Sequence, residues 1–244
     1  MMIHASKVAL AMSLIACAFS AYAQDEEEVE LGWSGKGELG FVSTTGNTES
    51  TALNGKLNFV YTTETWRHRF GLTALMTSED GTKENERYQA EVQSDRKLTE
   101  RSWIFGAVRF DADKFGAYDP QVTATAGYGH SLMKSDNHEL KGEIGAGYRH
   151  LEERETGVTS DEAILRFVLD DTWTISDNMA WTNRLLVETG SENTFSQFNT
   201  GFSVAMTSKL AVKLGYEVRN NTKVPPGDTE KTDTQATVNL VYNF

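Results

Sequence analysis

The stretch TVNLVYNF at residues 237–244 closes the sequence and alternates between two kinds of side chain. Large apolar side chains occupy every second position, namely Val238, Leu240, Tyr242 and Phe244. The positions between them are polar, with Val241 as the exception. Such alternation predicts a β-strand with one apolar face and one polar face. Because a chain end is usually frayed and polar, we expect an apolar environment to hold this strand. That environment is either the core of a soluble sandwich or the lipid around a membrane barrel.

The first 23 residues have the pattern of a secretory signal peptide. Lys7 precedes the apolar run VALAMSLIACAF at residues 8–19, and the small-x-small site AYA follows it. This order predicts cleavage after Ala23. An alternative is lipidation of Cys17, because LIAC resembles the box of a bacterial lipoprotein. Either route exports the protein.

The exported chain is acidic and lacks cysteine. Removal of residues 1–23 leaves 22 basic against 35 acidic residues and takes away Cys17, the one cysteine of the sequence. Nucleic-acid phosphates require a basic surface, so nucleic acid is not an expected partner. Simple adsorption to an anionic membrane is disfavoured for the same reason. We expect residues 24–32, which contain DEEEVE, to form an acidic periplasmic segment ahead of the folded domain.

The remaining sequence contains no run of 18 apolar residues, so it predicts no transmembrane helix. A membrane strand, however, needs only about 9–11 residues with alternate ones apolar. Seven segments alternate in this way: 51–62, 66–76, 87–98, 122–132, 139–150, 209–220 and 237–244. Five more strands are expected near 35–45, 102–112, 161–174, 179–190 and 195–207. In WIFGAVRF (103–110) and AILRFVLDD (163–171) both parities carry apolar residues, so the sequence leaves the faces of these strands unassigned.

Strand length, gap length and tryptophan placement favour the membrane barrel over the sandwich. The alternating segments are about as long as those that cross a tilted barrel wall, whereas strands of soluble proteins usually have about 5–6 residues. Short gaps, such as 62–65 and 175–178, alternate with longer ones, such as 78–86 and 221–231. The tryptophans stand beside the short gaps. The sequence therefore predicts an interfacial aromatic rim at that end of the barrel, where indole rings favour the headgroup level. Its members are Trp33, Trp66, Trp103, Trp173, Trp181 and Phe244.

We therefore predict an all-β, antiparallel transmembrane β-barrel of twelve strands over residues 33–244, located in the outer membrane of a Gram-negative cell. An even number of strands places both termini on one side, the periplasm. The alternative is a soluble periplasmic β-protein, or a lipoprotein attached through Cys17.

The polar faces of the strands predict a lumen with charges of both signs. The expected lumen-facing residues are Lys56, Arg67, Arg69, Glu91, Asp95, Lys97, Glu143, Arg149, Lys213, Glu217, Arg219 and Asp233. Such side chains tune ion selectivity in an open pore. In a barrel of modest diameter they can instead pair across the lumen and close it. We therefore predict a narrow passive channel for ions and small solutes, or a structural component of the envelope.

No motif indicates a catalytic, cofactor or metal site, and we predict that the protein is not an enzyme. The histidines after the signal peptide, His68, His130, His138 and His150, are scattered among strands and turns. The glycine clusters GYGH and GEIGAGY lack the ending of a phosphate loop, and the acidic runs lack the spacing of a calcium loop. The alternative function is an outer-membrane enzyme that modifies lipid or lipopolysaccharide, with a histidine beside a serine or carboxylate at one membrane face.

Several segments carry a resemblance to a family of uncharacterised Gram-negative proteins that are described as salt-induced outer membrane proteins. They are GWSGKGELGFVSTTGNTES (32–50), DKFGAYDPQ (113–121), GAGYRH (145–150), SDNMAW (176–181) and VNLVYNF (238–244). The resemblance implies an outer-membrane barrel and brings no substrate or catalytic residue. The last strand is also similar to the signal that the barrel assembly machinery recognises. The expected partners are therefore this machinery, outer-membrane lipids and lipopolysaccharide.

Overall fold

The computed structural model describes residues 31–44, 49–225 and 230–244. The predicted signal peptide, the alternative lipidation site Cys17 and residues 24–30 of the acidic segment lie outside the described residues. The described part of the chain contains no helix that is long and apolar enough to span a membrane.

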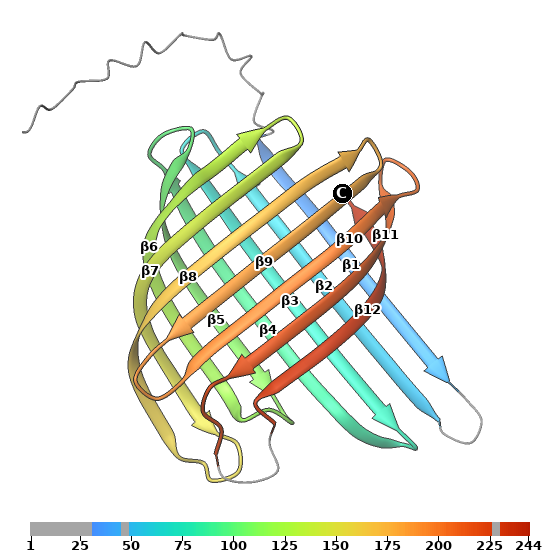
Figure 1. The fold of residues 1–244 in the computed structure, drawn as a ribbon, viewed down its shortest axis with the longest axis vertical. Coiled ribbons are helices and arrows are strands. Elements are labelled where there is room, and N and C mark those ends of the chain that lie inside the picture. The colour runs from blue at the N-terminus through green and yellow to red at the C-terminus, as the bar shows by residue number, and fades with distance from the viewer. Residues whose placement is uncertain (1–30, 45–48, 226–229) are drawn as a thin grey trace, which may run out of the picture. The chain divides into compact units, whose positions relative to one another are not determined.

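Twelve antiparallel strands form a closed barrel, which confirms the predicted fold class and number of strands (Figure 1). The strands are β1 (Gly32–Thr44), β2 (Ser50–Thr62), β3 (Trp66–Glu79), β4 (Thr82–Lys97), β5 (Ser102–Asp113), β6 (Tyr118–Ser135), β7 (His138–Glu153), β8 (Thr159–Ser176), β9 (Met179–Thr189), β10 (Thr194–Ala205), β11 (Leu210–Asn221) and β12 (Thr232–Asn243). Each strand pairs with its neighbours in sequence, and β12 pairs with β1 to complete the ring. Each of the seven segments with strict alternation and of the five less regular ones overlaps one strand.

The barrel has two different ends. We call the end where β1 begins and β12 finishes the terminal end, and the opposite end the loop end. The β3–β4 connection at the loop end is shorter than the sequence predicts. Residues 78–86, expected as a long loop, belong mostly to β3 and β4, which meet in a turn at Asp80 and Gly81. Both turn residues have positive φ, 47° and 77°, the backbone that a two-residue hairpin with the right twist requires.

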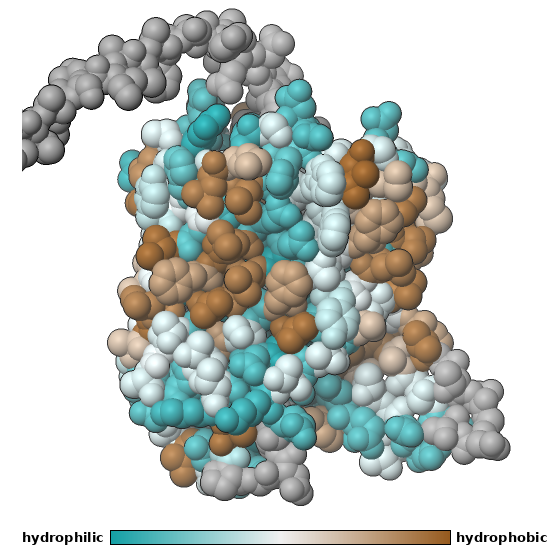
Figure 2. Space-filling view, viewed as in Figure 1, coloured by the Kyte–Doolittle hydropathy of each residue, from teal (hydrophilic) through white to brown (hydrophobic). Residues whose placement is uncertain are grey.

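Apolar side chains cover the outside of the barrel. Figure 2 shows them gathered over the middle of the visible face, with hydrophilic side chains toward both ends. The last strand follows this rule, because Val238, Leu240, Tyr242 and Phe244 are exposed. Val241, the exception to the alternation, is only 1% exposed and lies on the inner face. This outside-apolar arrangement is the inverse of a soluble barrel and is typical of one surrounded by lipid.

Exposed aromatic rings gather at the terminal end, where Trp33 stacks with Phe70 and lies at a tilt to Tyr61, and Trp66 stacks on His68. Trp173, Trp181 and Phe244 are exposed there as well. The prediction of an exposed rim is wrong for one residue. Trp103 is only 6% exposed and lies inside the barrel.

The inward position of Trp103 follows from the alternation of β5. Trp103, Phe105 and Ala107 point inward in succession, and Ile104 and Val108 point outward. Because both faces of β5 carry apolar residues, the sequence does not show which of the two sets points inward.

Glycines on the next two strands make room for the inward rings of β5. A methyl group at Gly129 of β6 would lie 2.1 Å from the ring of Trp103, and one at Gly145 of β7 would lie 2.9 Å from the ring of Phe105. The glycine clusters therefore serve packing and the close approach of strands.

We expect Gly127→Ala to destabilise the barrel. A methyl group there would lie 2.1 Å from the backbone oxygen of Ile144 on β7, so the two strands would have to separate. Overpacking of this kind costs about 1–3 kcal/mol of unfolding free energy. Urea unfolding of the detergent-folded protein, followed by tryptophan fluorescence, measures the change. The matched control is Gly106→Ala on β5, where a methyl group meets nothing within 4 Å. Equal unfolding midpoints for the two variants would contradict the close approach.

Candidate functional site

The lumen contains most of the charged side chains that the sequence assigns to it. Five of them are buried: Asp95, Glu143, Arg149, Glu217 and Arg219. Six are partly buried: Lys56, Arg67, Arg69, Glu91, Lys97 and Lys213. Asp233 is exposed near the loop end.

The sequence missed a second set of inward charges, which supply partners for the first. They are Glu38, Arg87, Arg109, Asp111, Glu162, Arg166, Asp170, Arg184 and Glu188. Several lie on β5 and β8, the strands whose faces the sequence left open. The signal that finds them is charge. Arg109 and Arg166 each share the parity of one of the two apolar sets in their strand, and that set is therefore the inner face.

One group of side chains is centred on Glu143 of β7. Arg69 of β3 donates to its Oε1 at 2.9 Å, and Arg166 of β8 donates to its Oε2 at 2.8 Å. Gln93 of β4 and the indole N–H of Trp103 also donate to Oε1, at 2.9 and 3.2 Å. Four donors from four strands thus satisfy one buried carboxylate, which a low-dielectric interior requires.

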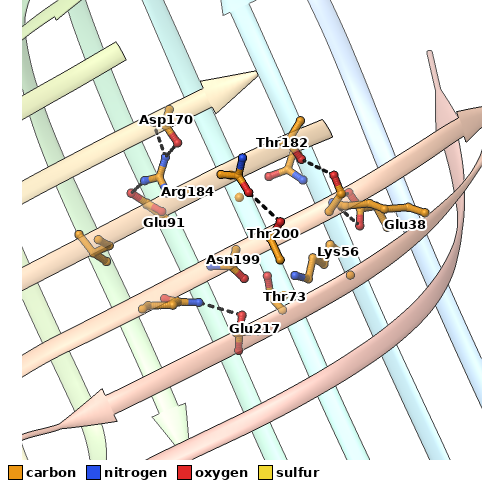
Figure 3. A pocket seen from close by; sticks show the side chains of 18 of the residues that line it. Glu38, Lys56, Thr73, Glu91, Asp170, Thr182, Arg184, Asn199, Thr200 and Glu217 are labelled. Carbon is orange, nitrogen blue, oxygen red and sulfur yellow. Dashed lines mark hydrogen bonds and ion pairs between the residues drawn. The ribbon is translucent and has the colours of Figure 1, made fainter. Parts of the chain in front are cut away.

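Ion pairs also cross the lumen, as Figure 3 shows for Arg184. Its guanidinium donates to both carboxylate oxygens of Asp170 at 3.0 Å and lies 3.6 Å from Glu91. Arg184 is on β9 and Glu91 is on β4, five strands away around the ring. The charged side chains therefore connect opposite walls and narrow the lumen.

A third group narrows the lumen toward the loop end. Arg87 of β4 pairs with Glu217 of β11, and Arg219 of β11 lies 3.4 Å from Asp111 of β5. Arg109 pairs with Asp111 and with Glu188 of β9. The ring of Phe195 lies between two guanidiniums, 4.9 Å from that of Arg109 and 5.1 Å from that of Arg219. Cation–π contacts of this kind strengthen when water is excluded.

A polar cavity of about 380 Å³ remains beside these ion pairs. It lies against β1 to β4 and β8 to β12, and its wall carries small or uncharged polar side chains such as Thr73, Asn199 and Thr237 (Figure 3). Lys56 also faces it; among the described residues its ammonium makes no close ion pair or hydrogen bond, although its charge acts on Glu38 and Glu217. The cavity can therefore hold water and small polar solutes.

The histidines are paired across strands rather than grouped in a catalytic site. His68 contacts Ser94 and His130 contacts Ser102, both at 2.9 Å, and both contacts use Nδ1. His138 and His150 lie beside aspartates on the neighbouring strand.

The Ser94–His68 and Ser102–His130 contacts each bring together the two groups that a nucleophile and its base require. Tyr128 already donates a hydrogen bond to the Ser102 hydroxyl at 2.8 Å, and no carboxylate among the described residues orients His130. Within the described part of the chain, no group of three metal-binding side chains occurs either. The Ser102–His130 pair therefore lacks, among the described residues, the third group that orients the base in a catalytic triad.

Comparison with known proteins agrees with the barrel geometry. Residues 37–244 match the family described as "Protein of unknown function, DUF481". The chain belongs to the DUF481 family. It is 26% identical over 213 residues to the uncharacterized protein YdiY of Escherichia coli K12, covering 87% of this chain and 83% of that protein.

Solved structures share the fold, and two examples have TM-scores above 0.5. The NanC porin has a TM-score of 0.53 at 9% identity, over 86% of this DUF481 chain and 99% of the porin. An outer membrane channel from Pseudomonas putida F1 has a TM-score of 0.54 at 12% identity, over 92% of this chain and 100% of the channel.

We expect Arg149→Met to lower the unfolding free energy by about 3–5 kcal/mol, because the buried carboxylate of Glu162 would lose its charged partner. Arg149 is fully buried, donates to Glu162 through Nε at 3.0 Å, and pairs with it through a second nitrogen. The matched control is Lys83→Met, which breaks the solvent-exposed pair with Glu86 and should change the unfolding free energy far less. Urea unfolding in detergent micelles compares the two variants. A loss for Arg149→Met no larger than for Lys83→Met would show that the buried pair does not stabilise the fold.

Proposed function

We propose that this DUF481 protein is an outer-membrane channel through which ions and small polar solutes pass passively. The observation that carries the proposal is a polar cavity inside a closed barrel whose outer wall is apolar. The fold shared with the NanC porin and the Pseudomonas channel supports this interpretation.

The outer wall supports placement in a membrane. Its exposed apolar side chains would be costly in water, and the exposed aromatic rings at the terminal end suit the headgroup region. We place the terminal end at the periplasm, because that orientation gives periplasmic termini. The exposed alternation of β12 up to Phe244 suits recognition by the barrel assembly machinery.

The inner wall supports a narrow channel for small solutes. Charges of both signs line it, and ion pairs such as Arg184 with Glu91 reach from one wall to the other. A solute must pass beside these side chains, so size limits entry more than charge does. The cavity wall of hydroxyl and amide groups can replace part of the hydration shell of a passing ion.

Single-channel conductance in planar bilayers tests the proposal. The purified, detergent-folded protein should give discrete current steps over a range of salt concentrations. The double variant Arg87→Gln/Glu217→Gln should give larger steps, because it removes a cross-lumen ion pair without leaving either charge unpaired. The matched control is Lys83→Gln/Glu86→Gln, an exposed pair outside the lumen. A folded protein that inserts and never conducts would overturn the channel.

A further inference from the structure

The junction between β1 and β12 is the shortest in the barrel. Its ladder joins only four residue pairs, from Lys36 with Asn243 to Leu39 with Leu240. Gly35 and Phe244 add two backbone hydrogen bonds, of 2.7 and 2.9 Å. By contrast, β1 pairs with β2 over thirteen residues and β11 pairs with β12 over eleven. Figure 1 shows β1 and β12 together near the C-terminus and diverging toward the loop end.

Just past the end of the ladder, Gly40 still lies close to β12. A methyl group there would lie 2.3 Å from the side-chain oxygen of Asn239 and 2.8 Å from the backbone oxygen of Val238. Continued pairing would then place Val42 opposite Thr237, but no such pair forms among the described residues. Val42 has the parity of the inward-facing Glu38, yet it is 52% exposed. We call this unpaired part of the junction the seam.

The unpaired backbone groups of the seam lower the stability of the barrel unless water can hydrogen-bond to them. Unpaired backbone N–H and C=O groups in contact with hydrocarbon cost several kcal/mol each. The cavity supplies the water, because its wall includes Thr237 and Asn239 of β12 together with Lys56 and Asn58 of β2. The seam thus connects a wet polar space with the outside of the barrel.

Positive charge accumulates behind the seam. Glu38 of β1 is the carboxylate that its neighbouring lysines share, with Lys213 of β11 at 2.9 Å and Lys36 at 3.8 Å. Lys56 lies opposite Glu38 on β2, and its charge also acts on Glu38. Three ammonium groups therefore lie around Glu38, on β1, β2 and β11, and Lys56 also acts on Glu217 of β11. Lys56 makes no ion pair of its own with any described residue, so an anionic ligand group beside it would gain a charged partner.

The outside of the seam is apolar. Phe41 of β1 and Val238 of β12 are more than half exposed there, and so are Leu39 and Leu240 in the adjoining paired ladder. A molecule with an acidic head and an apolar tail would match both surfaces at once.

We propose that the seam is a side portal that binds a single-chain amphiphile with an anionic headgroup. The headgroup lies on Lys56 in the cavity, and the tail passes between β1 and β12 into the bilayer. This assignment rests on the proposed membrane location and gives the channel a lateral entrance for molecules that arrive through the membrane.

Photo-crosslinking of amphiphiles tests the portal. Diazirine-labelled palmitate and lysophosphatidylglycerol carry the anionic head, and labelled monopalmitin is the uncharged comparison. With the protein in phosphatidylcholine vesicles, we expect saturable labelling of β1 and β12 by the anionic probes, located by mass spectrometry. Labelling by palmitate alone identifies the carboxylate as the ligand, and labelling by both acidic probes extends the site to phosphate heads.

The variant Lys56→Gln should weaken this labelling about tenfold, the effect of losing one charged hydrogen bond. The matched control Lys141→Gln removes an inward ammonium of β7, paired with Glu139 and away from the seam, and should keep full labelling. Labelling spread evenly over the outer wall, or unchanged in Lys56→Gln, overturns the portal.

A disulfide tests the opening independently of the lysine. In a chain with Cys17→Ala, Val42→Cys/Thr237→Cys should oxidise more slowly than Leu39→Cys/Leu240→Cys, whose positions are already paired. Once formed, the first disulfide closes the seam and should abolish probe labelling, while the second should leave labelling intact. Fast oxidation of both pairs, or labelling that survives the first disulfide, overturns the portal. If labelling behaves as expected but no variant conducts, the portal stands and the channel function fails.

Discussion

The structure depends on one constraint, which is that a barrel with an apolar outside must satisfy its backbone from within. Lipid offers no hydrogen bonds, so twelve strands pair with their neighbours until the sheet meets itself. Closure fixes the parity of every strand, since a shift of one residue would turn a charged face toward lipid. The exposed apolar wall and the charged lumen are therefore two results of the same requirement.

Closure also explains why the interior is so rich in ion pairs. A ring of modest diameter brings charged side chains from opposite walls within reach of each other. Each buried charge then needs partners, and Glu143 obtains four of them from different strands. The side chains on β5 to β7 fill their part of the lumen, whereas the cavity lies against β1 to β4 and β8 to β12.

The sequence predicted the fold well because alternation is a local property. The polar positions of β2, β4 and β7 marked their inner faces directly, as Lys56, Glu91 and Glu143 illustrate. Prediction failed where both faces are apolar, and so Trp103 was placed on the outer rim although it lies inside. The sequence predicts a long loop at the Asp80 hairpin, because the ends of β3 and β4 beside the turn carry mostly polar residues. The cavity and the seam depend on contacts between distant strands, which no local pattern encodes.

The short ladder between β1 and β12 has a consequence for how the barrel assembles. These strands come from opposite ends of the folded chain, so joining them costs more chain entropy than any hairpin does. Only four residue pairs and the Gly35–Phe244 hydrogen bonds compensate for that cost. Ring closure is then the last event of folding and the first to reverse. Amide hydrogen exchange should be fastest along this edge. The two backbone hydrogen bonds between Phe244 and Gly35 help to hold the ring closed.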